Sequence, residues 1–231
     1  MKLNYTLKRE KRRSLTIRIT ENADVIVKAP HRLPQQQIDQ FLEEKSGWIS
    51  KKLALQQRRS GERPAHRFNE GEKFEYLGET YSLQIIPPSA VTKYGLTLRE
   101  PLDLHQDFIL HAEKQPKARE AFTKWYKSEA RTILADRVGH FCDLAGLRHQ
   151  SIKLSNAKTR WGSCSSKGNL NFNWRIIMAP MEVVDYLVAH EVAHLRHQNH
   201  SKSFWNLVGE IYPDYKQHRR WLKENGHRLE I

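Results

Sequence analysis

The stretch that decides the fold runs over residues 183–201 and reads VVDYLVAHEVAHLRHQNHS. Apolar residues recur in it every three to four positions, at Val184, Leu187, Val188 and Leu195. This spacing predicts an amphipathic helix. Because Pro180 is favourable just before a first turn, we expect the helix to run from Met181 to about His197.

The predicted helix carries the pentapeptide His190-Glu191-Val192-Ala193-His194. Two histidines four residues apart project from one helix face and can share a metal ion. Zinc binds imidazole well and keeps an open position for water or substrate. The metal would lower the pKa of a bound water, and Glu191 stands beside the ligands to accept its proton and return it to a leaving group. The pattern therefore predicts a zinc site with Glu191 as its acid and base.

Three residues are candidates for the third metal ligand. His200 follows Gln198-Asn199, which can turn the chain back because asparagine tolerates the left-handed conformation. The spacing of the histidines is then that of the metzincin pattern, with His197 in place of the glycine of that pattern. Glu210 would be a carboxylate ligand from the next helix, and His197 itself lies on the face of the first pair. We expect His200, because one straight helix does not wrap three ligands round a tetrahedral ion.

The composition excludes several classes of protein. The 231 residues include 39 Lys and Arg against 26 Asp and Glu, a formal net charge of +13. With 39% hydrophobic residues and six Trp the chain is too apolar to be disordered, and a mean hydropathy of −0.74 argues against a membrane protein. The N-terminal residues carry no apolar stretch of a secretion signal, and Cys142 and Cys164 cannot form a disulfide framework. We therefore expect a cytoplasmic protein with reduced thiols and no membrane partner.

The charge is uneven along the chain. Residues 1–60 carry 14 basic and 6 acidic residues, residues 61–113 carry 5 and 9, and residues 114–231 carry 20 and 11. A basic surface favours nucleic acids, nucleotides and other anions as partners. The alternative is a charged face that only interacts with water.

Outside the helix, the pattern predicts a β-rich first part and a mixed second part. Alternating apolar residues predict strands near residues 3–7, 15–19, 23–27, 96–98, 108–110, 152–154 and 170–176, with a hairpin turning at Gly78-Glu79. Helical periodicity predicts helices over 34–59, 116–144 and 201–212, with Gly146 after the second and Ser201 before the third. We divide the chain into residues 1–113, a β-rich part with one helix, and residues 114–231, which hold the metal site.

Three stretches resemble the YgjP-like metallopeptidase domain, a family related to the SprT-like and WLM zinc proteins. They are Thr159-Arg160-Trp161-Gly162-Ser163-Cys164, Asn171-Phe172-Asn173-Trp174-Arg175, and residues 190–205, which read HEVAHLRHQNHSKSFW. Residues 5–30 and the helix that ends in Trp48-Ile49-Ser50-Lys51-Lys52 resemble the N-terminal part of the family. The resemblance thus covers nearly the whole chain.

The resemblance implies a zinc-dependent hydrolase with His190, His194 and His200 as ligands and Glu191 as catalytic acid and base. The expected fold class is α+β: a β-rich N-terminal part, then a zincin-like part in which a short sheet packs against the helix of the metal site. We expect one Zn²⁺, with other divalent metals as alternatives.

Five further residues are candidates for binding substrate or the transition state. Arg160 and Arg175 would hold an anion or a developing oxyanion. Asn171 and Asn173 would line a strand edge that receives the substrate backbone. Tyr212 would donate a hydrogen bond to the transition state. The alternative for each of the five is a purely structural role.

Three functions are compatible with these residues. The first is a zinc metallopeptidase, in which Glu191 moves the proton. The second is a metal-dependent hydrolase of nucleoside triphosphates, with the basic second part holding the phosphates in the absence of a P-loop. The third is a nucleic-acid-associated adaptor with a structural zinc, against which Glu191 argues because a structural site has no use for it. The substrate is accordingly a peptide or an anion, and the sequence predicts no oligomeric state.

Overall fold

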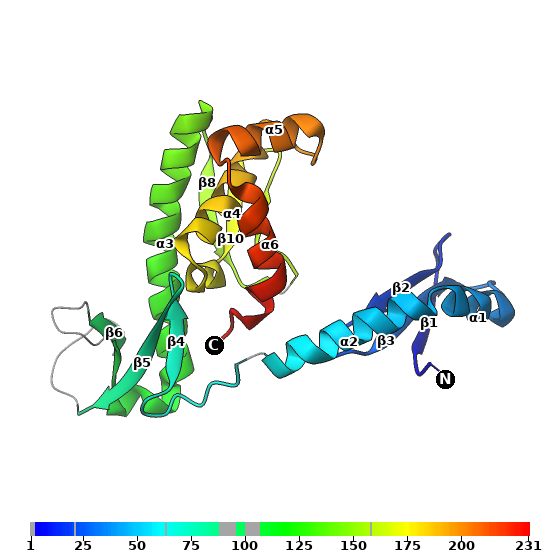
Figure 1. Cartoon of the computed structure of the whole chain (residues 1–231), viewed down its shortest axis with the longest axis horizontal. Coiled ribbons are helices and arrows are strands. Elements are labelled where there is room, and N and C mark those ends of the chain that lie inside the picture. Colours follow the sequence, from blue (N-terminus) through cyan, green and yellow to red (C-terminus); the bar gives the residue numbers. More distant parts are fainter. Residues whose placement is uncertain (1–2, 21, 63, 88–95, 100–106, 158) are drawn as a thin grey trace. The chain divides into compact units, whose positions relative to one another are not determined.

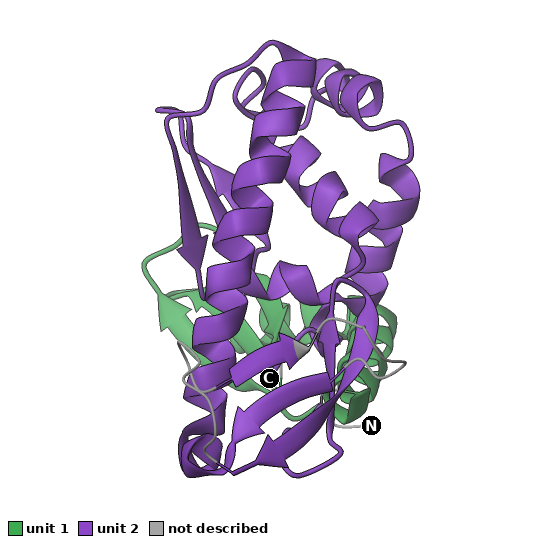
Figure 2. Ribbon diagram, turned by 90° about the vertical axis from the view of Figure 1, so that its left-hand side faces the viewer, with its two compact units in different colours: residues 1–63 green, residues 64–231 purple. Residues whose placement is uncertain are grey.

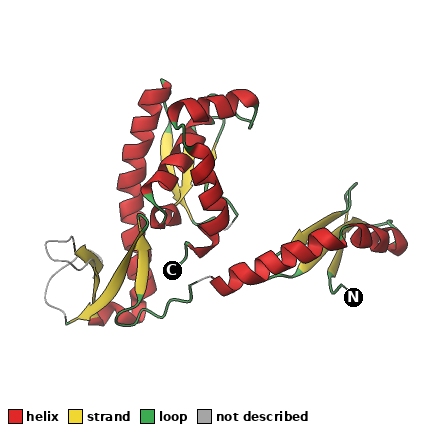
Figure 3. Cartoon of the chain, in the orientation of Figure 1, coloured by secondary structure: helices red, strands yellow, loops and turns green. Residues whose placement is uncertain are grey.

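The structure is a computed structural model that describes residues 3–20, 22–62, 64–87, 96–99, 107–157 and 159–231 (Figure 1). The chain divides into two compact units, Met1–Arg63 and Pro64–Ile231 (Figure 2). Each unit combines helices with strands, which confirms a mixed α+β chain (Figure 3). Within the described ranges, no helix is long and apolar enough to cross a lipid bilayer.

The first unit is a small sheet with two helices. Its elements are β1 (Thr6–Glu10), β2 (Thr16–Ile19), β3 (Val25–Pro30), α1 (Gln35–Glu44) and α2 (Ser46–Glu62). The strands lie in the order β1-β3-β2, with β1 parallel and β2 antiparallel to β3. Every second residue of β3 is buried, so one face of the sheet forms the core, which Ile38, Leu42 and Ile49 of the helices complete. The single helix predicted over residues 34–59 is two helices that meet at Lys45.

The second unit contains two sheets and most of the helices. Its elements are β4 (Lys73–Tyr76), β5 (Glu79–Ile86), β6 (Leu96–Arg99), β7 (Asp107–His111), the 3-10 turn η1 (Ala112–Lys117), α3 (Ala118–Ala145), β8 (Ser151–Ser155), β9 (Gly162–Cys164), β10 (Asn169–Asn173), the 3-10 turn η2 (Trp174–Met178), α4 (Met181–Ala193), α5 (Lys202–Ile211), α6 (Tyr215–Asn225) and η3 (Gly226–Arg228). The sheet orders are β4-β5-β7-β6 and β8-β10-β9. In the described part of the chain β9 pairs only with β10, so it is an edge strand.

The long helix α3 contacts both sheets of the second unit and also α4, the helix on which the sequence predicts the metal site. It ends at Gly146, whose left-handed φ of +61° confirms the predicted cap. Aromatic residues fill its contact with the sheet β4-β5-β7-β6. The ring centroids of Phe74 and Phe122 lie 4.3 Å apart, and those of Phe108 and Trp125 lie 4.9 Å apart. The other elements in contact with α3 include α4, β8 and α5. α3 is therefore the common support of the unit.

The compact units do not coincide with the predicted division at residue 113. Strands β4 to β7 contribute Phe74, Leu83 and Phe108 to the same core as α3, so these strands pack with the C-terminal part. The hydroxyl of Tyr126 on α3 also donates a hydrogen bond to the Glu75 carbonyl in β4, at 2.6 Å. The boundary between the units lies before Pro64, where two separate hydrophobic cores meet the chain.

The turn between β4 and β5 lies against Pro180, the residue that precedes α4. Leu77 and Gly78 have φ values of +50° and +86°, as in a two-residue hairpin turn. The Leu77 N–H donates to the Ile177 carbonyl at 2.8 Å. A Cβ atom on Gly78 would lie 2.9 Å from the Cα of Pro180. The hairpin therefore packs against the start of α4 and supports it.

We expect Gly78→Ala to lower the free energy of unfolding by at least about 2 kcal/mol, because the left-handed φ and the contact with Pro180 both penalise a side chain. Gly71→Ala is the matched control, since Gly71 has φ +76° but no atom within 4 Å of an added Cβ. Its cost should be about 1 kcal/mol. Chemical denaturation of the metal-free variants measures both, and equal costs would contradict the contact with Pro180.

Candidate metal centre

The helix that carries the first two histidines ends earlier than predicted. α4 stops at Ala193, and His194 caps it. The next two N–H groups donate three residues back, to the carbonyls of Val192 and Ala193, at 2.9 and 3.2 Å. The Gln198 side chain donates to the His194 carbonyl at 2.7 Å. The chain thus turns tightly after His194, and the turn brings His200 back to the end of the helix.

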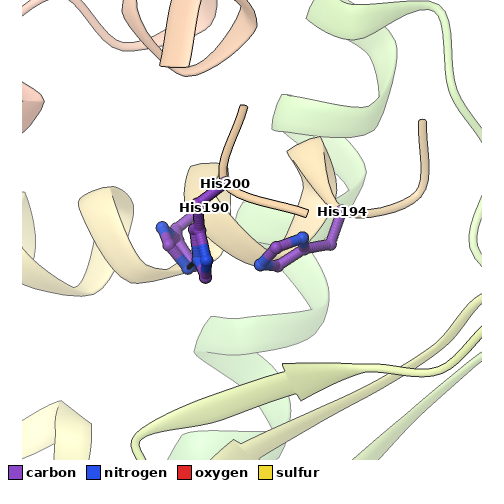
Figure 4. A group of neighbouring side chains, drawn as sticks. All are labelled: His190, His194 and His200. Carbon is purple, nitrogen blue, oxygen red and sulfur yellow. Dashed lines mark hydrogen bonds between the residues drawn. The ribbon is translucent and has the colours of Figure 1, made fainter. Parts of the chain in front are cut away.

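Three imidazole rings converge at this turn (Figure 4). His190, His194 and His200 each offer one ring nitrogen, and these atoms all lie within 4.8 Å of one another. The Nε2 atoms of His190 and His200 are 3.1 Å apart. Two nitrogens bound tetrahedrally to one zinc ion at about 2.0–2.1 Å would lie about 3.3 Å apart. Among the described residues this is the only such group, and neither His197 nor Glu210 belongs to it.

Phe204 is the common support of the three rings. Its side chain is fully buried, and its ring centroid lies 5.0, 4.4 and 4.8 Å from those of His190, His194 and His200. The Ser201 hydroxyl accepts a hydrogen bond from the Phe204 N–H at 3.4 Å, which confirms the predicted cap of α5. A buried ring in contact with all three imidazoles limits their rotation, so the ligand nitrogens are held in place.

Burial favours the neutral form of His190 and His194. Burial, together with the neighbouring histidines, lowers the pKa of His190 to about 3, and burial also lowers the pKa of His194. The Nδ1 of His194 lies 2.9 Å from the His197 carbonyl oxygen, so it carries the proton and leaves Nε2 free to bind a metal. The Nδ1 of His190 is buried without a hydrogen-bond partner in the described part of the chain. Because metals bind neutral imidazole, this donor set fits a metal ion.

Glu191 lies beside the histidines and faces β9. Its side chain is only 3% exposed, and its Oε2 has no hydrogen-bond partner among the described residues. Burial raises the pKa of Glu191 to about 8, and the charge of nearby Arg160 acts in the opposite direction. A carboxyl group with this pKa exchanges a proton near neutral pH.

Gly162 makes room for the Glu191 carboxylate. A Cβ atom on this first residue of β9 would lie 2.6 Å from the Cδ of Glu191, inside van der Waals contact. The sequence predictions do not include Gly162. The one local signal for it is a glycine inside a strand, which marks a close approach of another group.

Of the five further candidates, Arg160 lies near Glu191 and Asn171 lies on the strand that pairs with β9. Arg160 is exposed just before β9, and its effect on the Glu191 pKa shows that its charge is close. Asn171 pairs with Ser163 of β9, and its buried Oδ1 has no hydrogen-bond partner in the described ranges. Cys164, in the same strand, is a free thiol whose pKa burial and Glu191 raise to about 11, so it remains protonated.

The structure does not bring the other three candidates to the histidines. Asn173 caps η2, where its Oδ1 accepts the Arg175 N–H at 3.1 Å, so the strand predicted over 170–176 ends there. Arg175 pairs with Glu230 at 3.1 Å. The Tyr212 hydroxyl donates to the Glu182 carbonyl at 2.9 Å, in the first turn of α4. Glu182 is eight residues before the first histidine, about 12 Å along the helix axis.

We expect the protein to bind one metal ion per chain and His190→Ala, His194→Ala and His200→Ala each to weaken binding at least about tenfold. His197→Ala is the matched control, because its carbonyl rather than its ring contacts the group. Zinc titration followed by metal analysis after dialysis measures each variant. Full retention by His200→Ala, or loss in His197→Ala, would contradict the assignment of the third ligand.

Comparison with known proteins bears on the same residues. Residues 13–225 match the model of the YgjP-like family, metallopeptidase domain. No curated protein matches the chain. The crystal structure of the metallopeptidase zymogen of Pyrococcus abyssi abylysin is similar over 42% of this chain and 99% of that chain, with 23% identity and a TM-score of 0.37, a likeness too distant to carry an argument. The family match spans most of the chain and contains the histidine group, so the chain belongs to the YgjP-like metallopeptidase domain family.

Proposed function

We propose that this chain is a zinc-dependent peptidase in which Glu191 acts as general base and general acid. The observation that carries the proposal is the group of three converging histidines with a buried carboxylate beside it at the end of α4. Family membership indicates a metal-dependent hydrolase. Three imidazole nitrogens are a donor set typical of catalytic zinc, which when bound would polarise a carbonyl and supply a water of lowered pKa.

Glu191 would hold and move the proton of the reaction. Its Oε2 is buried and unpaired among the described residues, so it is available as an acceptor. A buried polar atom without a partner costs free energy, which supports a functional reason for its position. With a pKa near 8 the carboxyl group would take up a proton and later donate it to the leaving amine.

The edge of β9 would hold the backbone of the substrate. Its side away from β10 has no partner strand in the described part of the chain. An extended peptide that pairs there would pass Gly162 and therefore lie beside Glu191. Arg160, exposed at the start of this edge, would face a developing oxyanion, and Asn171 would orient the strand from its other side.

Hydrolysis of nucleoside triphosphates at the same histidines remains the alternative prediction. Binding of nucleic acid through the basic surface also remains a prediction. The converging histidines and Glu191 serve a phosphorus centre as well as a carbonyl, so only the substrate distinguishes the two hydrolases.

The zinc-loaded protein should cleave a mixture of unfolded peptides, such as a casein digest. Glu191→Gln should lower the rate at least about 100-fold with zinc content unchanged, because the amide keeps the shape of the side chain and cannot accept the proton. Mass spectrometry of the products and phosphate release from a nucleoside triphosphate are measured in parallel. Cleavage of the triphosphate alone would replace the peptidase proposal, and equal rates for variant and parent would contradict the role of Glu191.

Gly162→Ala should lower kcat at least about tenfold while the bound zinc is retained. The three heavy atoms nearest to the added methyl group all belong to the Glu191 side chain, so the substitution displaces that carboxylate. Gly139→Ala on α3 is the control, because nothing lies within 4 Å of its Cβ. Steady-state kinetics on a peptide identified in the screen measures both. Unchanged kcat in Gly162→Ala would show that the carboxylate does not need its place against β9.

A further inference from the structure

The guanidinium group of Arg219 lies close to the histidines and has no counter-ion among the described residues. Arg219, on α6, lies over the ring of Trp205 with its Cζ 4.5 Å from the ring centroid. Arg137 and Arg175 of the same unit pair with carboxylates at 2.6 and 3.1 Å. Arg219 pairs with no carboxylate and makes no hydrogen bond among the described residues. It is therefore held by an aromatic ring and available to an anion.

Trp205 connects Arg219 with the metal centre. Its ring stacks on that of His200, with centroids 5.7 Å apart and planes 23° apart, and lies 5.6 Å from that of His190. Tyr215, one turn before Arg219 on α6, also stacks on Trp205 at 5.3 Å. The 4.5 and 5.7 Å separations together place the guanidinium within about 10 Å of the His200 ring. That distance corresponds to about three residues of an extended peptide.

Arg219 also lies near the face of α4 that carries the histidines. α6 packs directly against α4. Burial raises the pKa of Tyr186 to about 12, and the charge of Arg219 acts against that rise. The same charge contributes, after burial and the two neighbouring histidines, to the lowered pKa of His190. The stacking and the electrostatics thus agree on a guanidinium at the border of the metal centre.

We propose that Arg219 binds a carboxylate of the substrate and is a specificity-determining residue for peptides with an acidic group within about three residues of the cleaved bond. This inference rests on the proposed peptidase function. The planar fork of a guanidinium matches a carboxylate bidentately. Contact with the Trp205 face orients the fork before the substrate arrives, which reduces the entropy lost on binding. The carboxylate belongs to an acidic side chain or to the C-terminus of the peptide.

A positioning role would give a different result. If Arg219 only pressed Trp205 onto His200, its loss would slow the cleavage of every peptide to the same extent. If it binds a carboxylate, its loss removes a preference and leaves neutral peptides unaffected. The discriminating quantity is therefore the ratio of kcat/KM between matched acidic and neutral peptides.

The test uses the zinc-loaded full chain and peptides that differ by Glu, Gln or Lys at one position within three residues of the cleaved bond. Each peptide is made with an amidated and with a free C-terminus. The parent should prefer Glu over Gln by at least about tenfold, mainly through KM. Arg219→Gln should abolish the preference, and Arg219→Lys should keep part of it. An equal loss for all peptides, or a preference that survives in Arg219→Gln, would overturn the proposal.

Arg220→Gln is the matched control. Arg220 is the next residue on α6, is exposed, and carries the same charge without the contact to Trp205. Its loss should leave the Glu/Gln ratio unchanged. A fall in the ratio as large as that of Arg219→Gln would show a general effect of net charge and overturn the inference.

A binding measurement without turnover distinguishes a failure of the carboxylate site from a failure of the proposed peptidase function. Titration calorimetry of the same Glu and Gln peptides on zinc-loaded Glu191→Gln measures affinity without turnover. If the parent cleaves no peptide, the peptidase proposal fails, yet tighter binding of the Glu peptide that Arg219→Gln removes would still support the carboxylate site. Equal affinity for the Glu and Gln peptides would overturn the carboxylate site whatever the parent cleaves.

Discussion

The packing of three imidazole rings around Phe204 is the contact on which the site depends. The ring of Phe204 is fully buried and lies within 5.0 Å of each imidazole, centroid to centroid. Burial favours the neutral form of His190 and His194, and contact with the Phe204 ring restricts the rotation of all three imidazoles, whose nitrogens converge. The same burial leaves the Oε2 of Glu191 without a partner among the described residues. The site thus combines three converging nitrogen donors with a buried carboxylate.

The packing of the three histidines around Phe204 requires α4 to end at Ala193 and to be fixed by neighbouring elements along its length. The start of the helix is supported by the hairpin turn at Pro180 and by the Tyr212 hydroxyl on the Glu182 carbonyl. Its middle is tied to α3 by the bidentate pair of Arg137 and Asp185, at 2.6 and 2.9 Å. Strands β4 to β7 therefore belong to the unit of the histidines because they pack against α3 and against the start of α4.

Local patterns predict the histidine group but not its surroundings. The spacing of His190 and His194 on a helix, and a turn before His200, are properties of a short stretch, so the sequence alone predicts all three. Two features of the surroundings depend on elements far apart in the chain. They are the closeness of Gly162 to Glu191 and the packing of the sheet β4-β5-β7-β6 against α3. The predicted division at residue 113 fails to match the units for that reason, because an apolar sheet face does not reveal which helix covers it. Tyrosine is a residue type that occurs in catalytic sites. Only the structure shows that the Tyr212 hydroxyl instead donates to the Glu182 carbonyl in the first turn of α4.

A rigid set of histidines leaves selectivity to the groups around it. Ligand nitrogens that are fixed by a buried ring respond little to the identity of the substrate, because their positions are set before it binds. Arg160 and Arg219 approach the site from different elements, and neither pairs with a carboxylate among the described residues. Of the two, only Arg219 contacts an aromatic ring among the described residues, and orientation separates a specific anion site from diffuse positive charge. Orientation on Trp205 therefore distinguishes Arg219 from the other basic residues: in the proposal it selects where a substrate carboxylate lies relative to the reacting bond.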